Sequence, residues 1–510
     1  MARAAYLLGD VGRFSHHVIG LPLYDYQIAP LRAVVESVLR RRGREFLLVF
    51  PRQSGKNEAV AQLLVYLLTL LQRAGGQMVY GAVGDGLGRG MRRLEQRLDT
   101  PWTRGQWRRE ARPARYTLGR AAVVFLSSHP GAASRGETAD HLLVIDEAQD
   151  QDAAHIESVF TPMRAARNAT AIYLGTVRQT ADFLWVKKGE LESATAADGI
   201  QRVFLVEPDT VAAENATYGA FLAEQVRRYG RNHPIVAAEY FLEPHDGRGG
   251  LFPEWRLALM RGGHSRLRAP RPDERYVAAI DLAGQDEAGA SEATLRNPGR
   301  DYTVATIFRV VETADEGGPA YEAVDVLIDH GSRHFQAAPG QPRLADMLLA
   351  YLRHWAVAHT IIDASGVGQG LADWLSDRLG AGGVTAFQLG GATAKARLGS
   401  DFLALIDTGR FRYWAEDAPD DDAWWFGQQA AACAYSLAGQ GRFDRDLRWG
   451  VPAAARVATP NGAELLHDDR LLSAALVAEL ERRRQQGTLL LGASASRVVR
   501  GRDPLSGAPY

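Results

Sequence analysis

Phe46-Leu-Leu-Val-Phe-Pro-Arg-Gln-Ser-Gly-Lys-Asn57 decides the fold class of the first half of this 510-residue chain. The apolar run at its start predicts a buried strand, and the residues that follow it predict a helix over Glu58–Leu71. A strand, a turn with Gly and Lys, and then a helix form the context of a P-loop, whose backbone N–H groups and helix N-terminus face the phosphates of a nucleotide. The stretch therefore predicts a nucleotide-binding α/β domain.

The residue types inside this loop fit phosphate chemistry. Gly55 allows the backbone to approach a phosphate closely, and the Lys56 ammonium neutralises β- and γ-phosphate oxygens. Two positions depart from the general pattern, because Phe50 stands where the first glycine is usual and Asn57 replaces the Ser or Thr that binds Mg²⁺. A Gly-Lys turn without function is the alternative interpretation. The predicted nucleotide-binding residues of the loop are Arg52, Gln53, Ser54, Gly55, Lys56 and Asn57.

A second motif, Leu142-Leu-Val-Ile-Asp-Glu147, is an apolar strand that ends in two acids. An acid in the position of Asp146 holds the Mg²⁺ of a nucleotide, and one in the position of Glu147 orients or deprotonates the attacking water. Such a strand is common by itself, but it is a known partner of a P-loop that lies about ninety residues upstream. Together the two motifs predict ATP hydrolysis, with Asp146 as a magnesium ligand and Glu147 as a catalytic residue.

Apolar runs alternate with helical or loop stretches through the first half of the chain. They indicate strands of a largely parallel sheet at Phe46–Phe50, Met78–Ala82, Ala121–Leu126, Leu142–Ile145 and Ala171–Gly175. Gly, Pro and Arg then become frequent, which indicates a connector. We expect a P-loop ATPase domain over residues 1–245, a linker over 246–272, a second α/β domain over 273–486 and a flexible tail over 487–510.

The second domain places acids at the ends of its predicted strands. The strand patterns are Tyr276–Asp281, Tyr302–Val311, Tyr321–Ile328 and Thr360–Asp363, and His467-Asp-Asp469 precedes a helix-like stretch, Leu471–Leu480. Carboxylates that converge from different elements are needed to bridge two Mg²⁺ or Mn²⁺ ions about 3.5 to 4 Å apart. Each acid alone is also compatible with a turn or a helix cap. The predicted metal ligands are Asp281, Asp363 and Asp469, with Asp468 and Asp301 in reserve.

The composition is that of a folded protein, with 46% apolar residues, 23% charged residues and a net charge of −1. A uniformly basic protein is excluded, but nucleic-acid binding needs only a local positive patch. The single cysteine, Cys433, permits neither an internal disulfide nor a cysteine-based zinc site, and it fits a reducing cytosol. The best apolar run, Ala59–Leu71, is too short to span a bilayer, so the sequence predicts an intracellular protein with no membrane partner.

Five motifs, in this order, resemble the ATPase half of the large terminase subunits of tailed bacteriophages. They are Tyr24-Asp-Tyr-Gln27, the loop with its arginine Arg52, Ser134-Arg-Gly136, Asp146-Glu-Ala148 and Leu174-Gly-Thr176. The terminase pattern tolerates a non-glycine first position and carries an arginine in the loop, so Phe50 and Arg52 fit it better than they fit a general P-loop. Asn57 departs from it. The resemblance extends over nearly the whole chain, from about Tyr24 to Glu481.

The resemblance implies further roles in the ATPase half. Tyr26 and Gln27 would contact the adenine, and Thr176 would couple hydrolysis to movement. Arg52 would sense or stabilise the γ-phosphate, since a cation placed against the transferred phosphoryl group is worth about 10³ to 10⁵ in rate. Arg135 is the alternative, as a finger that acts on a neighbouring subunit.

The second half resembles the RNase H-like nuclease domain that follows the motor in terminases, through the order of its acids, Asp363-Ala-Ser-Gly-Val-Gly and His467-Asp-Asp469. This implies two-metal endonuclease activity on double-stranded DNA, with ATP and Mg²⁺ or Mn²⁺ as cofactors. It also implies a homo-oligomeric ring, in terminases a pentamer, at the portal vertex of a procapsid in the host cytoplasm, with the portal protein and a small terminase subunit as partners. A monomeric isolated chain is equally compatible with the sequence.

Arginine is the main source of positive charge for DNA contacts. The candidate phosphate contacts are Arg89, Arg92, Arg93 and Arg97, the stretch Arg108–Arg115, and Lys187 with Lys188. For any single one of them, a solvated helix face is the favoured interpretation over a DNA contact, and Trp424-Trp425-Phe426 is interpreted as core rather than as a base-stacking platform. The alternatives to a terminase are a helicase or remodelling ATPase without nuclease activity and a structural DNA-packaging component with a decayed active site.

Overall fold

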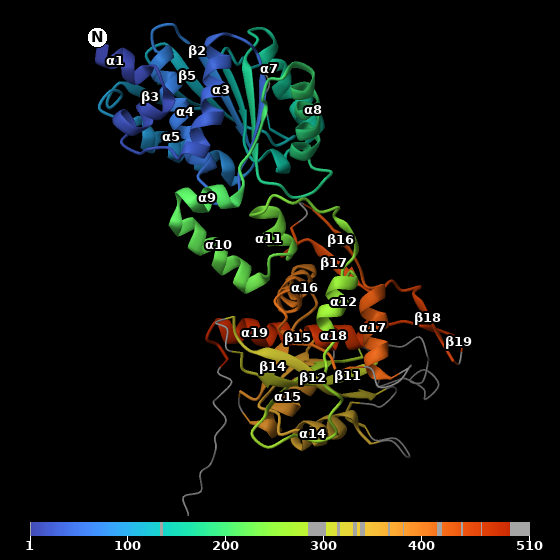
Figure 1. The fold of residues 1–510 in the computed structure, drawn as a ribbon. Coiled ribbons are helices and arrows are strands. Elements are labelled where there is room, and N and C mark those ends of the chain that lie inside the picture. The colour runs from blue at the N-terminus through green and yellow to red at the C-terminus, as the bar shows by residue number, and fades with distance from the viewer. Residues whose placement is uncertain are drawn as a thin grey trace, which may run out of the picture. The chain divides into compact units, whose positions relative to one another are not determined.

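The computed structural model describes residues 2–132, 136–283, 302–313, 317–329, 334–336, 342–365, 368–380, 382–415, 421–439, 442–460 and 462–489. Two compact units emerge, which we call unit 1 (Met1–Val226 and Arg231–Gly247) and unit 2 (Arg227–Gly230 and Arg248–Tyr510) (Figure 1). In the described part of the chain, no helix combines the length and the apolar character needed to cross a bilayer.

Unit 1 is built on an eight-stranded sheet with the order β3-β4-β5-β2-β6-β7-β1-β8. Adjacent strands from β5 to β8 are parallel, and their central members are buried at nearly every position because helices cover both faces. This confirms the five strands predicted from apolar runs. The strands are β1 (Glu45–Val49), β2 (Gly76–Ala82), β3 (Trp107–Ala111), β4 (Ala114–Leu118), β5 (Ala121–Ser127), β6 (Leu142–Ile145), β7 (Thr170–Gly175) and β8 (Val203–Leu205).

Helices lie on both faces of the unit 1 sheet. Because crossovers between parallel strands are right-handed, the chain places α4 and α5 with α3 over one face and α7 and α8 over the other (Figure 1). These five helices are α3 (Asp25–Leu39), α4 (Lys56–Leu71), α5 (Asp85–Leu98), α7 (Thr161–Ala165) and α8 (Phe183–Asp198). The remaining helical segments of the unit are α1 (Ala2–Leu8), α2 (Val11–Phe14), η1 (Ser15–Ile19), η2 (Ala148–Asp150), α6 (Ala153–His155), η3 (Ile156–Phe160), α9 (Pro208–Glu214), α10 (Ala216–Tyr229), whose end belongs to unit 2, and α11 (Pro234–Glu239).

The hairpin of β3 and β4 was not predicted from sequence. It pairs antiparallel with the edge of the sheet through β5. Four of the five residues of β3 are exposed, and three of them are charged, so the strand shows no apolar run. An edge strand is specified by backbone pairing rather than by burial, so its sequence carries no strand pattern. The arginines of β3 are therefore recognisable from sequence only as candidate DNA contacts.

Unit 2 contains a six-stranded sheet with the order β14-β13-β10-β11-β12-β15. Strands β10, β11 and β12 form an antiparallel meander, and β13 adds parallel to β10. The four strands predicted here are confirmed, with ends that differ by at most one residue. They are β10 (Arg275–Asp281), β11 (Thr303–Val311), β12 (Ala320–Asp329) and β13 (His359–Asp363). The shorter strands are β14 (Val384–Phe387), β15 (Phe411–Arg412), β16 (Ala434–Leu437), β17 (Leu447–Gly450), β18 (Arg456–Thr459) and β19 (Gly462–Leu465).

The helices of unit 2 cover both faces of this sheet. One face is covered by α14 and α15, and the other by α18 and α19 (Figure 1). The predicted helix Leu471–Leu480 is in fact two helices, since the chain breaks at Leu476. The helices are α14 (Leu344–His354), α15 (Gly368–Leu379), α16 (Ala392–Asp407), α17 (Asp422–Ala432), α18 (Asp469–Ala475) and α19 (Val477–Gln485).

Residues 246–272, expected to be a linker, join unit 2 from Arg248 onward. They contain strand β9 (Arg248–Gly250), which pairs with β16, and helix α12 (Glu254–Met260). Arg256 of α12 donates to both carboxylate oxygens of Asp407 at 2.8 Å, and both side chains are buried. The Gly- and Arg-rich composition does not indicate that this segment is part of unit 2, because β9 is held by backbone hydrogen bonds to β16 and α12 by the ion pair of Arg256 with Asp407.

Candidate functional site

The predicted P-loop connects the carboxyl end of β1 to the first residue of α4. Gln53 and Gly55 have positive φ angles of 64° and 86°, which turn the chain just ahead of the helix. A Cβ atom on Gly55 would lie 2.6 Å from Nε2 of Gln27, so glycine is required for space as well as for its backbone conformation. Lys56 begins α4 and is only 8% exposed. The strand, turn and helix therefore have the arrangement that the sequence predicted.

Two residues of α3 brace this loop. The Tyr26 hydroxyl donates to the Ser54 carbonyl at 2.8 Å, and Nε2 of Gln27 donates to the carbonyls of Ser54 and Gly55, each at 3.3 Å. Burial raises the pKa of Tyr26, which keeps its hydroxyl a donor. Both side chains thus hold the loop backbone itself. Their expected contact with adenine stays a prediction.

Lys56 meets the acidic strand end directly. Its ammonium donates to Oε2 of Glu147 at 3.1 Å, across a separation of 91 residues in sequence. Glu147 has a positive φ of 47°, and Asp146, which precedes it, is fully buried. The Tyr80 hydroxyl donates to Oδ2 of Asp146 at 2.6 Å, and the backbone N–H of Glu147 donates to Oδ1 at 2.9 Å. The two motifs singled out in the sequence therefore form one site.

The environments of the two acids differ. Burial raises the pKa of the Asp146 carboxyl, although the Lys56 charge acts against it. Burial acts in the same direction on Glu147, but the Lys56 charge and hydrogen bonds from Gln149 and Lys56 outweigh it, so the pKa of Glu147 is lowered. Glu147 is therefore ionised at neutral pH, as a residue that orients or deprotonates a water must be.

Asn57 and Arg52 are the two loop residues that bear on the chemistry of a bound nucleotide. Oδ1 of Asn57 is buried and has no hydrogen-bond partner among the described residues. An amide oxygen is a hard oxygen donor of the kind that Mg²⁺ accepts, so the loop with Asn57 and Asp146 fits a magnesium nucleotide. The Arg52 guanidinium is half exposed and pairs with the Glu239 carboxylate of α11, while its backbone N–H donates to the Glu239 carbonyl at 2.8 Å.

Two residues of this site were not found from sequence. Glu239 carries the partner carboxylate of Arg52, and Gln149 connects Glu147 to the backbone of Thr176 at the end of β7. The Thr176 hydroxyl also donates to the Phe50 carbonyl at 3.3 Å. Gln149 follows directly on Asp146-Glu-Ala148, which was the available signal. Arg135, the alternative finger, lies outside the described residues.

In unit 2, two of the predicted metal ligands stand side by side. Strands β10 and β13 are parallel and pair Ile280 with Ile362, so the next residues in register are Asp281 and Asp363 at their carboxyl ends. Neighbouring strands lie about 4.8 Å apart. Asp281 is 7% exposed, and Oδ1 of Asp363 accepts hydrogen bonds from the backbone and hydroxyl of Ser365.

The third predicted ligand, Asp469, lies at the same end of this sheet. Its Oδ2 accepts a hydrogen bond of 3.0 Å from the N–H of Tyr302, which directly precedes β11, and Val304 of β11 pairs with Asp281. One turn further along α18, Ser473 donates to the Ala279 carbonyl of β10. The three acids are thus drawn from three elements toward one sheet end, and their oxygen chemistry fits Mg²⁺ or Mn²⁺.

Metal binding also depends on the spacing of the acids. Within the described ranges, no three acidic, histidine or cysteine side chains are close enough together to hold a metal ion. Of the two reserves, Asp468 lies 3.7 Å from the Lys395 ammonium, and Asp301 is outside the described residues.

A polar cavity of about 250 Å³ has Tyr302, Trp425, His467 and Arg470 in its wall, and the backbone N–H of Tyr302 donates to Asp469. The expectation that Trp424-Trp425-Phe426 is core holds for Phe426, which is buried and stacks on Tyr413 at 4.1 Å. Trp424 and Trp425 are both partly buried, and Trp425 lies in the wall of the cavity.

Many cations proposed for DNA are engaged in ion pairs. On α5, Arg97 and Arg93 pair with Glu58, whereas Arg89 and Arg92 are exposed. The remaining pairs are Arg109 with Glu95, Arg115 with Glu137, Lys187 with Glu190 and Lys188 with Glu192. Among the described residues, neither Arg89 nor Arg92 forms an ion pair with a carboxylate, and a cation without such a pair is freer to bind phosphate, so these two are the stronger candidates on this helix.

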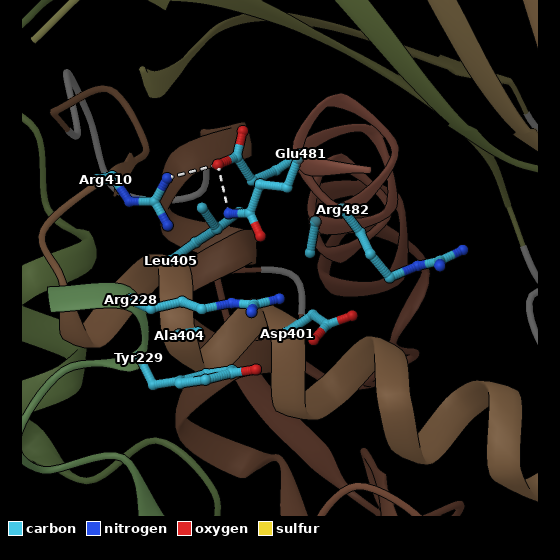
Figure 2. Close-up of a pocket in the computed structure, with 10 residues that line it drawn as sticks. Arg228, Tyr229, Asp401, Ala404, Leu405, Arg410, Glu481 and Arg482 are labelled. Carbon is cyan, nitrogen blue, oxygen red and sulfur yellow. Dashed lines mark hydrogen bonds and ion pairs between the residues drawn. The ribbon is translucent and has the colours of Figure 1, made fainter. Parts of the chain in front are cut away.

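A small pocket in unit 2 is distinct from both candidate sites. Figure 2 shows Arg228 and Asp401 reaching into it, with the ion pair of Arg410 and Glu481, 2.7 Å long, at one end. Its volume of about 30 Å³ accommodates water but not a nucleotide. Oδ2 of Asp401 has no hydrogen-bond partner among the described residues, and burial raises the pKa of this carboxyl to about 6, against the charges of Arg482, Arg397 and Arg228.

Asp401 predicts a pH dependence of stability. Its folded pKa of about 6 lies above the ordinary value of 3.8, so folding binds a proton between these pH values and the unfolding free energy falls as pH rises through 6. We expect Asp401→Asn to remove this loss, which is on the order of 2 kcal/mol. Denaturant titrations of wild type and variant at pH 4.5 and pH 7.5 measure it. Equal stability differences at the two pH values would contradict the assignment.

Comparison with known proteins finds large terminases of phages among the solved structures. No protein-family model and no curated protein sequence matches the chain. The large terminase of a thermophilic bacteriophage aligns with 90% of this chain and 99% of its own, at 11% identity and a TM-score of 0.43. The HK97 bacteriophage large terminase aligns with 93% of this chain and 99% of its own, at 14% identity and a TM-score of 0.38.

A large terminase nuclease is also among the similar structures. The large terminase nuclease of thermophilic phage G20c, solved with bound magnesium, covers 45% of this chain and 96% of its own length, at 17% identity and a TM-score of 0.30. The first of the two full-length terminases has also been solved with ADP and with ATP-gamma-S. Solved structures that align with most of this chain thus include large terminases of phages.

Proposed function

We propose that this chain is a terminase large subunit, a viral DNA-packaging motor that hydrolyses ATP to translocate double-stranded DNA into a procapsid and cuts concatemeric DNA with a two-metal endonuclease. The observation that carries the proposal is the contact of Lys56 with Glu147, because it unites the P-loop with the acidic strand end in one buried site. The acids at one sheet end of unit 2 supply the second activity.

In the ATPase site, the contacts between the loop and the strand-end acids support the following roles. Gln53, Ser54 and Gly55 present backbone N–H groups to the phosphates, and Lys56 neutralises their charge. Asn57 and Asp146 hold the magnesium of the nucleotide, and Glu147 orients the attacking water. Arg52, which pairs with Glu239, would stabilise the charge on the transferred phosphoryl group. Thr176, whose hydroxyl donates to the Phe50 carbonyl at the start of the loop, would couple hydrolysis to movement.

In the nuclease site, Asp281, Asp363 and Asp469 hold two Mg²⁺ or Mn²⁺ ions in a domain with an RNase H-like fold. The bound ions supply an activated water and stabilise the leaving 3′ oxygen. The meander of β10, β11 and β12 followed by parallel β13 supports this fold, since it brings acids from several elements to one sheet end.

The partners follow from the same function. Double-stranded DNA is the substrate, the portal protein is the docking site, and a small terminase subunit selects the viral DNA. The chain works as a homo-oligomer, a pentamer in our proposal, at the portal vertex of the procapsid in the host cytoplasm. No membrane takes part.

A triplex-displacement assay tests the motor directly. A motor that moves along duplex DNA removes a third strand from a blunt duplex in an ATP-dependent reaction and leaves the two duplex strands paired. We expect this result for the purified protein with ATP and Mg²⁺. Release of one strand from a forked duplex, without triplex displacement and without cleavage in Mn²⁺, would instead identify a helicase.

A further inference from the structure

The side-chain amide of Gln149 spans the ends of two neighbouring strands in unit 1. Its Nε2 donates to Oε2 of Glu147 at 2.8 Å, just beyond β6. Its Oε1 accepts from the backbone N–H of Thr176 at 3.2 Å, just beyond β7. One rigid planar group thus touches both the carboxylate proposed to orient the water and the residue proposed to couple hydrolysis to movement.

The orientation of this amide is fixed by its partners. The N–H of Thr176 can only donate, so it must face the amide oxygen, and this turns the NH₂ group toward the carboxylate of Glu147. A flipped amide would place two acceptors against each other at Glu147 and two donors at Thr176. Gln149 therefore cannot satisfy either partner in the other orientation.

The site is shaped to receive this side chain. Gln149 is 8% exposed. A Cβ atom on Gly175 would lie 2.4 Å from Oε1 of Gln149 and 2.3 Å from a methyl group of Leu184. Glycine at the end of β7 therefore leaves the space that the amide occupies, and any side chain at that position would push the amide away from Thr176.

Among the described residues, Lys56 and Gln149 donate hydrogen bonds to the Glu147 carboxylate, and a bound nucleotide would affect the two donors differently. The ammonium of Lys56 is proposed to neutralise phosphate oxygens, so a nucleotide competes with Glu147 for it. The neutral amide of Gln149 has no such competition. When phosphates engage Lys56, the hydrogen bond from Gln149 is the contact that still fixes the Glu147 carboxylate.

We propose that Gln149 is a positioning residue that holds the Glu147 carboxylate in line for hydrolysis and links its position to Thr176, so that hydrolysis and movement along DNA are coupled through one amide. The inference rests on the proposed ATPase function and deepens it. It assigns to Gln149 no contact with the nucleotide, and so predicts that nucleotide affinity does not depend on this residue.

Gln149→Glu tests the hydrogen bond to Glu147 separately from the hydrogen bond to Thr176. It keeps the size of the side chain and an acceptor for Thr176, but it removes the donor to Glu147 and places a second carboxylate there. We expect kcat for ATP to fall by about 10², with the KM for ATP and the affinity for a fluorescent ATP analogue unchanged. The matched control is Gln201→Glu, an exposed glutamine of the same unit, which leaves kcat unchanged.

The coupling is measured in the same preparations. Residual hydrolysis by Gln149→Ala, which breaks both contacts, is expected to displace less triplex strand per ATP than hydrolysis by wild type. An unchanged kcat in both Gln149 variants would overturn the inference. A loss of nucleotide affinity together with a lower melting temperature would also overturn it, because that result would indicate a purely structural role for Gln149. Absence of DNA-stimulated hydrolysis in wild type overturns the proposed function itself and so is distinguishable.

Discussion

Lys56→Ala is expected to lower ATP hydrolysis by about 10³ or more and to leave metal-dependent nicking of DNA intact. The Lys56 ammonium is the cation of the loop that meets the strand-end acids, and charge on the transferred phosphoryl group is stabilised chiefly by such preorganised cations. The acids proposed for cleavage belong to unit 2, which has its own sheet and core. Phosphate release and plasmid relaxation, followed with the same protein, measure the two effects.

The matched control is Lys188→Ala, which removes a lysine of the same unit that pairs with Glu192 on the surface of α8. Its basal hydrolysis without DNA is expected to equal that of wild type. Lys56 also forms an ion pair with the partly buried Glu147 carboxylate, so its removal could destabilise the fold. Melting curves of Lys56→Ala therefore serve to check that the variant is folded. Preserved turnover in a folded Lys56→Ala variant would overturn the P-loop assignment.

Asp363→Ala is expected to reduce DNA cleavage by at least about 10³ and to leave ATP hydrolysis unchanged. Asp363 stands beside Asp281 in register, and loss of one carboxylate from a two-metal site removes a ligand that converges on the reacting phosphate. Plasmid nicking in Mn²⁺ measures cleavage, and phosphate release measures hydrolysis.

Asp373→Ala provides the comparison for this variant, since Asp373 is an acid of α15 that bonds only to Gln369 among the described residues. It is expected to cleave like wild type. Joint loss of hydrolysis and cleavage in Asp363→Ala would refute the separation of the two activities. Full cleavage in that variant would remove Asp363 from the metal site.

The buried strands were predictable because burial on both faces leaves a continuous apolar run in the sequence. Strand β6 was predicted with its observed limits, and β10 and β13 were predicted to within one residue. Edge elements were not predictable by the same reasoning, because β3 and β9 expose charged or glycine residues and are held through backbone hydrogen bonds. Strands that are buried on both faces leave a pattern in the sequence, whereas strands held only by backbone pairing do not.

The candidate site was predictable where chemistry dictates a residue type at a fixed place on a strand or loop. Lys56, Asp146 and Glu147 are such residues, and the structure brings them together. Two supporting residues of the site were missed. Gln149, although it directly follows Asp146-Glu-Ala148, joins Glu147 to the backbone of Thr176, and Glu239 pairs with Arg52. No spacing rule in the sequence specifies a contact such as Gln149 with Thr176 or Glu239 with Arg52. Tyr26 and Gln27 also support the loop backbone, a role that the sequence did not indicate, while their contact with adenine stays a prediction.

The most direct test of two activities in one chain is to follow phosphate release and plasmid degradation in the same tubes, with Mg²⁺ or Mn²⁺, for wild type, Lys56→Ala and Asp281→Ala. We predict that Lys56→Ala loses only hydrolysis and that Asp281→Ala loses only cleavage. Hydrolysis by the wild type without cleavage by any of the three proteins would contradict the account and leave a motor without a nuclease.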